Sequence, residues 1–270
     1  MKKYVLWLCI LFSAPGLRAA TVDTVSIYSN AMHKSIRCVV IHPDSKEALP
    51  VVYLLHGYSG NFSNWIMKVP RLKQYADEYR LLIVCPDGDY GSWYFDSPVD
   101  SSMRYETYIA KEVPAWIDAH YSTIKDRRAR AITGLSMGGH GGLFLAFRHA
   151  ETFGACGSMS GGVDLNSART KFDISKRIGD TIRYVDNWKR YSVINIVEKY
   201  PKDSLSIIFD CGTEDFFYPD NHALHEKMLR LKIPHDYIER PGKHDWMYWG
   251  NAVEYQLLFF KEYFSGRENK

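Results

Sequence analysis

Ser136 lies at the centre of residues 134–138, which read Gly-Leu-Ser-Met-Gly. An apolar run at 130–135 precedes this motif, and a run of small and apolar residues at 137–149 follows it. A serine on a sharp turn from strand to helix takes strained backbone angles, and glycines on either side relieve the crowding. Such a turn holds the hydroxyl above the edge of a sheet, beside the N–H groups that begin the helix. The pattern predicts a nucleophilic serine; the alternative is a glycine-rich helix start without chemistry.

A serine hydroxyl needs a base within hydrogen-bonding reach, and in doubly wound hydrolases the order along the chain is nucleophile, acid, histidine. The histidines that lie late enough in the chain are His222, His225, His235 and His244. The first two fall in a helical pattern, and His235 opens a predicted strand at its amino end. His244 follows the carboxyl end of that strand, so we expect His244 to be the base.

The acid is expected in the loop after the preceding strand, 205–211, where Asp210, Glu214 and Asp215 compete. Asp210 falls inside the strand, before Gly212 allows the chain to turn. Asp215 follows that turn and is best placed to reach back towards a histidine. Its expected role is to hold the tautomer of the imidazole and to stabilise the imidazolium.

An enzyme of this kind also needs two N–H donors for the oxyanion. The amide of Met137, directly after the serine, is expected to be the first. The second is expected from the loop after the early strand 51–56, where His56 and Gly57 let the backbone turn and present the amide of Tyr58. Because His56 precedes the serine in the chain, we interpret it as structural rather than as a base.

Apolar strand candidates alternate with amphipathic helical patterns along most of the chain, which is typical of a parallel sheet covered on both faces. We therefore predict an α/β fold with a doubly wound, mainly parallel, eight-stranded sheet whose first two strands form an antiparallel hairpin at one edge. The predicted strands are 25–28, 35–42, 51–56, 81–86, 130–135, 155–160, 205–211 and 235–239. The predicted helices are 64–78, 104–120, 137–149, 222–231 and 253–263.

Residues 1–20 have the features of a cleavable secretory signal peptide: Lys2 and Lys3, then a short apolar run, then small residues at Ala19 and Ala20. The formal net charge of +3 includes three positive charges in this leader and no acid, so the remainder has 3 − 3 = 0. We expect a secreted or periplasmic protein with no membrane segment after removal of the leader. A chain without net charge gives no indication of nucleic-acid binding.

Residues 21–270 are expected to form a single domain, because no repeat or linker interrupts the pattern. The longest irregular stretch, 163–204, is expected to cap the site; the alternative is a surface excursion. The cysteines at 38, 85, 156 and 211 each lie in a strand-like run and are expected to be buried free thiols. A bridge between Cys156 and Cys211 is the alternative, and the spacing matches no zinc site.

Five segments resemble the esterase D-like branch of the α/β-hydrolases, which includes S-formylglutathione hydrolases, feruloyl and acetyl-xylan esterases, tributyrin-type esterases and mycolyltransferases. The resemblance implies an α/β-hydrolase fold, a triad of Ser136, Asp215 and His244, oxyanion donors at Tyr58 and Met137, and no metal or cofactor. The segments are 54–57 (Leu-Leu-His-Gly), 86–88 with 92–94 (Pro-Asp-Gly and Ser-Trp-Tyr), 134–139 (Gly-Leu-Ser-Met-Gly-Gly), 211–215 (Cys-Gly-Thr-Glu-Asp) and 242–246 (Gly-Lys-His-Asp-Trp).

A leader argues against a glutathione thioester as substrate, since glutathione is cytosolic, and a mycolyltransferase usually has Asp-Gly where this chain has His56 and Gly57. We therefore expect a secreted serine ester hydrolase that forms an acyl-enzyme and acts on feruloyl, acetyl or short-chain esters of plant carbohydrate. The alternatives are a mycolyltransferase-type acyltransferase and a non-catalytic carbohydrate-binding relative. Substrate contacts are expected from Trp93, Tyr94, Phe216 and Trp246, although aromatic residues in such loops can equally be core.

Overall fold

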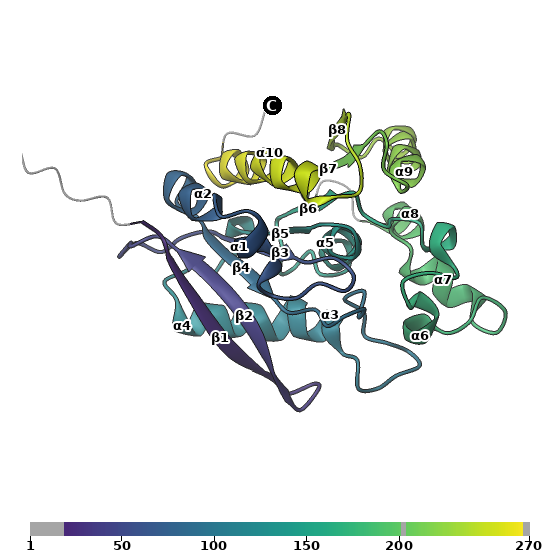
Figure 1. The fold of residues 1–270 in the computed structure, drawn as a ribbon, viewed down its shortest axis with the longest axis horizontal. Coiled ribbons are helices and arrows are strands. Elements are labelled where there is room, and N and C mark those ends of the chain that lie inside the picture. Colours follow the sequence, from purple (N-terminus) through teal and green to yellow (C-terminus); the bar gives the residue numbers. More distant parts are fainter. Residues whose placement is uncertain (1–18, 201–203, 267–270) are drawn as a thin grey trace, which may run out of the picture.

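The computed structural model describes residues 19–200 and 204–266, and its sheet has eight strands in the order β1-β2-β4-β3-β5-β6-β7-β8. β1 and β2 form an antiparallel hairpin, β2 pairs antiparallel with β4, and all other neighbours are parallel. The predicted fold class is therefore confirmed (Figure 1). The strands are β1 (Thr21–Ser29), β2 (Lys34–His42), β3 (Val51–Leu55), β4 (Leu82–Pro86), β5 (Arg130–Gly134), β6 (Ala155–Met159), β7 (Ser206–Gly212) and β8 (Asp236–Arg240).

The neighbouring strands β3 and β4 are buried at every position and consist almost entirely of apolar residues. In β3, Tyr53 and Leu55 pack into one core, whereas Val52 and Leu54 pack into the other. This alternation follows from the two-residue period of a strand. The sheet therefore separates two hydrophobic cores, and its carboxyl edge is the place where side chains from several strands can meet.

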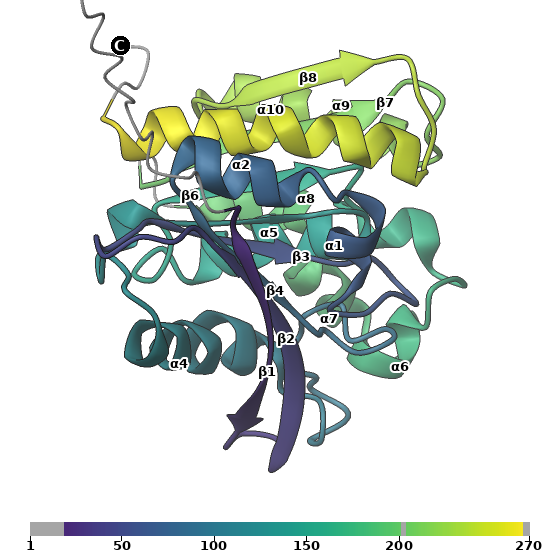
Figure 2. The same cartoon turned by 60° about the vertical axis from the view of Figure 1, so that its left-hand side comes forward.

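Helices cover both faces of the sheet. On one face lie α1 (Asn64–Lys68), α2 (Leu72–Tyr79) and α10 (Trp246–Phe264), with α2 and α10 side by side (Figure 2). The other face is covered by α5 (Met137–Arg148), α9 (Tyr218–Leu231) and a continuous helical segment. That segment consists of α3 (Tyr105–Thr107), a π-helical turn (Tyr108–Glu112) and α4 (Val113–His120).

Three predicted helices have clearly different limits in the structure, and one of them, predicted over 222–231, begins four residues earlier at Tyr218. The helix predicted over 64–78 is wrong as a single element, because the chain breaks between α1 and α2 at Val69 and Pro70. Proline lacks an N–H and disfavours helical angles at the residue before it. The helix predicted from 253 begins seven residues earlier, at Trp246, where the Asp245 carboxylate accepts a hydrogen bond of 3.0 Å from the N–H of Tyr248.

The described part of the stretch 163–204, residues 163–200, forms short helices that pack beside α5 (Figure 1). Trp188, Val193 and Ile178 from this stretch are buried in the same core as α5. Most of the stretch is therefore part of the body of the molecule. Its described elements are a 3₁₀ turn (Leu165–Ala168), α6 (Ile174–Ile178), α7 (Val185–Tyr191), α8 (Val193–Ile196) and a second 3₁₀ turn (Val197–Lys199).

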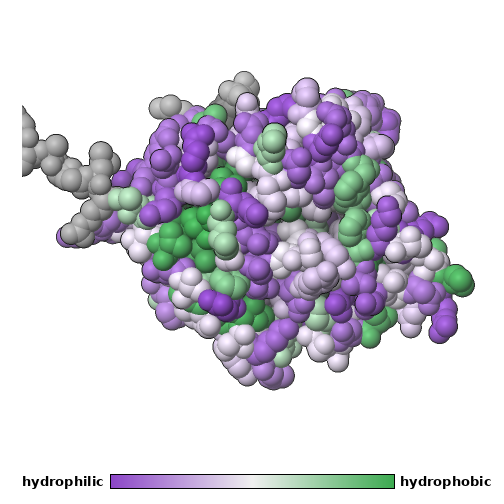
Figure 3. Space-filling view, in the orientation of Figure 1, coloured by the Kyte–Doolittle hydropathy of each residue, from purple (hydrophilic) through white to green (hydrophobic). Residues whose placement is uncertain are grey.

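The predicted leader lies outside the described residues except for its last two, Ala19 and Ala20. Within the described part of the chain, none of the helices combines the length and the hydropathy that crossing a membrane requires. On the face shown in Figure 3, hydrophilic side chains predominate and hydrophobic ones gather in small, separate areas. Cys38, Cys85, Cys156 and Cys211 are buried and free, which confirms the expectation of thiols and excludes the alternative bridge.

Candidate active site

Ser136 lies on a sharp turn between β5 and α5, with φ of 55° and ψ of −115°. A non-glycine residue with such angles is strained and persists only where its surroundings fix it. The flanking glycines show how tightly the turn packs. A Cβ at Gly134 would lie 2.6 Å from the carbonyl oxygen of Leu55, and a Cβ at Gly138 would lie equally close to that oxygen. The motif therefore holds the hydroxyl at the carboxyl edge of the sheet.

Ser136, His244 and Asp215 form a continuous hydrogen-bonded chain. His244 Nε2 lies 2.9 Å from Ser136 Oγ, and His244 Nδ1 lies 2.8 Å from Asp215 Oδ2. Asp215 Oδ1 accepts a further hydrogen bond of 2.8 Å from the N–H of Phe217. With the ring proton on Nδ1, held by the carboxylate, Nε2 can accept the proton of the serine hydroxyl. The structure thus brings the three predicted residues together.

The loops that carry the acid and the histidine are joined by their backbones. The N–H groups of Thr213 and Glu214 donate to the carbonyl oxygens of Arg240 and Gly242, each at 2.9 Å. Gly212 makes this approach possible, because a Cβ there would lie 2.3 Å from the oxygen of Gly242. The β7 and β8 loops therefore hold the carboxylate and the imidazole in register.

Asp210, the rejected candidate acid, lies elsewhere. It is fully buried, accepts a hydrogen bond of 2.8 Å from Gln256 Nε2, and lies 3.8 Å from Arg240 Nη2. Burial raises the pKa of this carboxyl to about 6, opposed by the hydrogen bond from Gln256 and the charge of Arg240. Asp210 is thus buried within β7, and the hydrogen bond to His244 comes from Asp215 instead.

The two expected oxyanion amides lie on either side of the serine. Met137 follows it at the start of α5, and Gly57 approaches it so closely that a Cβ there would lie 3.4 Å from Ser136 Cβ. In the described part of the chain, the amides of Tyr58 and Met137 donate no hydrogen bond to another group. Both N–H groups are thus available to an oxygen bound beside Ser136.

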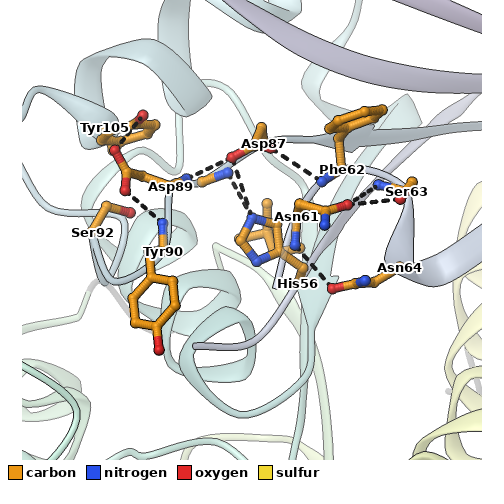
Figure 4. A network of polar contacts seen from close by, with 12 residues as sticks. His56, Asn61, Phe62, Ser63, Asn64, Asp87, Asp89, Tyr90, Ser92 and Tyr105 are labelled. Carbon is orange, nitrogen blue, oxygen red and sulfur yellow. Dashed lines mark hydrogen bonds and ion pairs between the residues drawn. The ribbon is translucent and has the colours of Figure 1, made fainter. Parts of the chain in front are cut away.

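His56 fixes the backbone of this loop through its two ring nitrogens, and its ring lies beside Asp87 (Figure 4). The N–H of Gly88 donates to His56 Nε2 at 2.7 Å, so this nitrogen is an acceptor, and Nδ1 carries the proton. The Nδ1–H group donates to the carbonyl oxygen of Gly57 at 2.8 Å. Since the C=O and N–H of one peptide unit point in opposite directions, holding the oxygen of Gly57 aims the N–H of Tyr58 the other way.

Asp87 organises the neighbouring loops around His56 (Figure 4). One carboxylate oxygen accepts from the N–H of Asp89 at 2.8 Å, and the other accepts from the N–H of Phe62 at 3.3 Å. Asp87 Oδ1 also lies 3.8 Å from His56 Nε2. The sequence indicated a structural His56 but not the part played by Asp87.

The four expected substrate contacts divide into two pairs. Trp93 and Tyr94 are almost completely buried, and the Tyr94 hydroxyl donates to the carbonyl oxygen of His56 at 2.9 Å. They belong to the core beneath the site, which was the alternative for these aromatic residues. Phe216 is 57% exposed, with its ring 4.2 Å from that of His244. Trp246 is half-buried against Trp65, with 5.2 Å between the ring centroids.

Two residues of the stretch 163–204 that the sequence did not indicate, Phe172 and Asp173, contact residues of the candidate site. The ring of Phe172 lies 5.5 Å from that of Tyr58 and 6.2 Å from that of Phe216. The carboxylate of Asp173 accepts a hydrogen bond of 2.9 Å from the Tyr58 hydroxyl. The length of the irregular stretch was the available signal, but nothing in it singled out these two positions.

Among residues 19–200 and 204–266, no group of three or more histidine, cysteine, aspartate or glutamate side chains is arranged to hold a metal ion.

A mainly parallel sheet covered on both faces, with a strained serine on the turn from a central strand to a helix, defines an α/β-hydrolase. The chain belongs to the Esterase family, whose model matches residues 29–260, and it is an esterase D-like serine esterase. It is 25% identical over 252 residues to an acetyl esterase of Caldicellulosiruptor saccharolyticus, covering 85% of this chain and 94% of the relative.

Two further relatives show the range of the family. A diacylglycerol acyltransferase/mycolyltransferase of Mycobacterium tuberculosis is 26% identical over 286 residues, covering 91% of this chain and 82% of the relative. The solved structure of a ferulic acid esterase superposes with a TM-score of 0.78 at 27% identity, covering 91% of this chain and 99% of that one. These similarities extend over nearly the whole described chain.

Replacing each candidate acid separately will distinguish their roles. Asp215→Asn is expected to lower kcat by about 10³- to 10⁴-fold, because the imidazole loses the partner that holds its tautomer. Asp210→Asn is expected to keep kcat within about threefold, since Asp210 does not touch His244. A larger loss in a folded Asp210→Asn protein would reverse the assignment; ester hydrolysis with both variants decides the point.

Asp210→Asn also has an expected pH signature. Because the folded protein holds the Asp210 proton up to a pKa of about 6, above the ordinary 3.8, the charged form is penalised. The free energy of unfolding of the wild type should fall relative to Asp210→Asn as pH rises from 4 to 6, by about 1.4 kcal/mol per unit, and stay level above 6. Urea denaturation at pH 4.5 and 7 measures the difference, and an equal gap at both pH values would contradict it.

Removing the His56 side chain tests its role under the Tyr58 amide. His56→Leu is expected to lower kcat by about 10²-fold with KM within about threefold, because the oxyanion amide is no longer aimed. His56→Asn keeps a donor near Nδ1 and should lose less. Steady-state kinetics of both variants, with thermal unfolding as a control, make the test; a wild-type kcat in His56→Leu would contradict the role.

Proposed function

We propose that Ser136 is the nucleophile of this serine ester hydrolase, His244 its base and Asp215 the acid that orients the base. The observation that carries this proposal is the hydrogen-bonded chain of 2.9 Å and 2.8 Å that starts at a strained serine. Ser136 Oγ attacks the ester carbonyl carbon as its proton passes to His244 Nε2. The carbonyl oxygen becomes an oxyanion that accepts from the N–H groups of Tyr58 and Met137.

The tetrahedral intermediate collapses when the imidazolium of His244 returns its proton to the leaving alkoxide, so that an alcohol departs and an acyl group remains on Ser136. Water then attacks the acyl-enzyme. His244 takes the proton of that water and gives it to Ser136 Oγ, which releases the carboxylic acid. No step needs a metal or a cofactor.

The substrates we propose are feruloyl, acetyl or short-chain esters carried by plant carbohydrate. The aromatic surface of Phe216, exposed beside the His244 ring, supports this class because sugar and cinnamoyl faces both pack on aromatic rings. The similarity to an acetyl esterase and to a ferulic acid esterase is a second support. The binding partner that we propose is therefore the substrate itself, a small-molecule or carbohydrate-linked ester.

Acyl transfer is the second candidate function, because the chain is also similar to a mycolyltransferase. The chemistry is the same until the acyl-enzyme has formed, and an acceptor hydroxyl then replaces water. The resemblance to mycolyltransferases implies Asp-Gly at the position where this chain has His56 and Gly57. Hydrolysis is therefore the function that we favour.

Replacing Ser136 by alanine tests the nucleophile and the substrate class together. We expect Ser136→Ala to lower kcat by about 10⁴-fold or more on methyl ferulate, acetylated xylan and p-nitrophenyl butyrate. Its unfolding temperature should stay close to that of the wild type, and the exposed Ser265→Ala is the matched control. Wild-type rates in Ser136→Ala would exclude the nucleophile, and product analysis with added alcohol would show transfer if an acyl ester accumulates.

We also propose that residues 1–20 direct export and are removed. The motif of two lysines, a short apolar run and small residues supports this. Expression of the full chain should yield a protein in the periplasm or medium that begins at Ala20 or Thr21. Amino-terminal sequencing of the purified protein checks this; a cytoplasmic protein that retains Met1 would contradict it.

A further inference from the structure

The ring of Phe172 contacts two aromatic rings of the proposed site, those of Tyr58 and Phe216. On one side its ring meets that of Tyr58, edge to face at 67°, and on the other it stacks on that of Phe216 at 18°. Tyr58 carries an expected oxyanion amide, and Phe216 lies against His244. Phe172 and Tyr58 are half-buried, and Phe216 is largely exposed. These rings thus line a surface that faces solvent, unlike rings of the core.

The backbone at Phe172 is strained. Phe172 and the next residue, Asp173, have φ of 57° and 54°, and neither is glycine. A bulky residue in this region is an outlier that lasts only where the surrounding structure fixes it, and such outliers gather at functional sites. Phe172 is therefore held in place at an energetic cost.

Two of the hydrogen bonds that hold this strained turn come from loops of the site, and Lys176 adds a backbone hydrogen bond and an ion pair to Asp173, each at 3.0 Å. The indole N–H of Trp93 donates to the carbonyl oxygen of Phe172 at 2.9 Å, and the Tyr58 hydroxyl donates to Asp173 Oδ2 at 2.9 Å. Trp93 in turn contacts Met137, because its backbone N–H lies 3.4 Å from Met137 Sδ. The turn is thus tied to the two residues whose amides are the expected oxyanion donors.

We propose that Phe172 determines the acyl specificity of the enzyme by selecting flat aromatic acyl groups over acetyl. This inference rests on the proposed function of Ser136. An acyl group bound at Ser136, with its carbonyl oxygen at the Tyr58 amide, starts beside the rings of Tyr58, Phe172 and Phe216. A conjugated aryl group can stack on these rings, whereas an acetyl group is too short to reach them. The hydrogen bond from Trp93 holds the strained backbone of Phe172, which places its ring beside those of Tyr58 and Phe216 before substrate binds.

The test measures kcat/KM for methyl ferulate and for p-nitrophenyl acetate and compares their ratio. Phe172→Leu keeps an apolar side chain of similar size but loses the ring, and we expect the ratio to fall by about tenfold, mainly through KM for the ferulate. Phe172→Tyr keeps the ring and should keep the ratio within about twofold. Ile182→Ala, at an 87% exposed position of the same stretch, is the matched control and should keep the wild-type ratio.

Tyr58→Phe supplies an independent variant, since it removes the hydroxyl that holds Asp173 but leaves the backbone amide. We expect a fall in the ratio in the same direction as for Phe172→Leu. Thermal unfolding of each variant shows whether it is folded. A wild-type ratio in a folded Phe172→Leu protein would overturn the inference, and so would an equal loss on both esters.

The failure of this inference is distinguishable from the failure of the proposed function. If the wild type cleaves the acetate through Ser136 but not the ferulate, the catalytic assignment stands and the aromatic specificity is wrong. If it cleaves neither ester, both are wrong. If it cleaves both esters, and Phe172→Leu loses activity on the ferulate while Phe172→Tyr keeps it, Phe172 is the specificity residue.

Discussion

Three backbone segments meet at the carboxyl edge of the sheet in a space that admits no side chain. Gly57, Gly134 and Gly138 come from two adjacent parallel strand ends and from the start of α5, and a Cβ at any of them would collide with a neighbour at 2.6 Å. This contact forces Ser136 into its left-handed conformation. It also places the Gly57–Tyr58 peptide beside the serine. The sharp turn at Ser136 and the position of the Tyr58 amide are consequences of the same close approach.

Two sets of hydrogen bonds hold these backbone segments together. From the β4 side, His56 and the loop around Asp87 hold the Gly57 peptide. From below, the fully buried Gln256 on α10 donates to the carbonyl oxygen of Ser158 on β6 and to Asp210 on β7, each at 2.8 Å. These hydrogen bonds lie in the protein interior, where an unpaired polar group lowers the free energy of unfolding. They therefore fix the position of α10 relative to β6 and β7.

The order of chemistry along the chain made much of the site predictable. The spacing of Gly134 and Gly138 predicts Ser136, and the ends of the parallel strands predict the positions of His244 and Asp215. Properties that depend on three-dimensional neighbours were not predictable. The burial of Tyr94 arises because its ring fills the space beside Gly88 and Gly141, and the approach of Phe172 depends on hydrogen bonds across 79 residues of chain. Pro70, by contrast, is a local signal for the break between α1 and α2, but the helical periodicity on both sides of it predicted one continuous helix.

Helix α10 sets the order in which the parts of the candidate site are made. It begins two residues after His244 and carries Gln256, so both of these residues are synthesised long after β5. Ser136 precedes His244 by 108 residues in the chain. During synthesis the serine therefore leaves the ribosome long before its hydrogen-bonding partner is made.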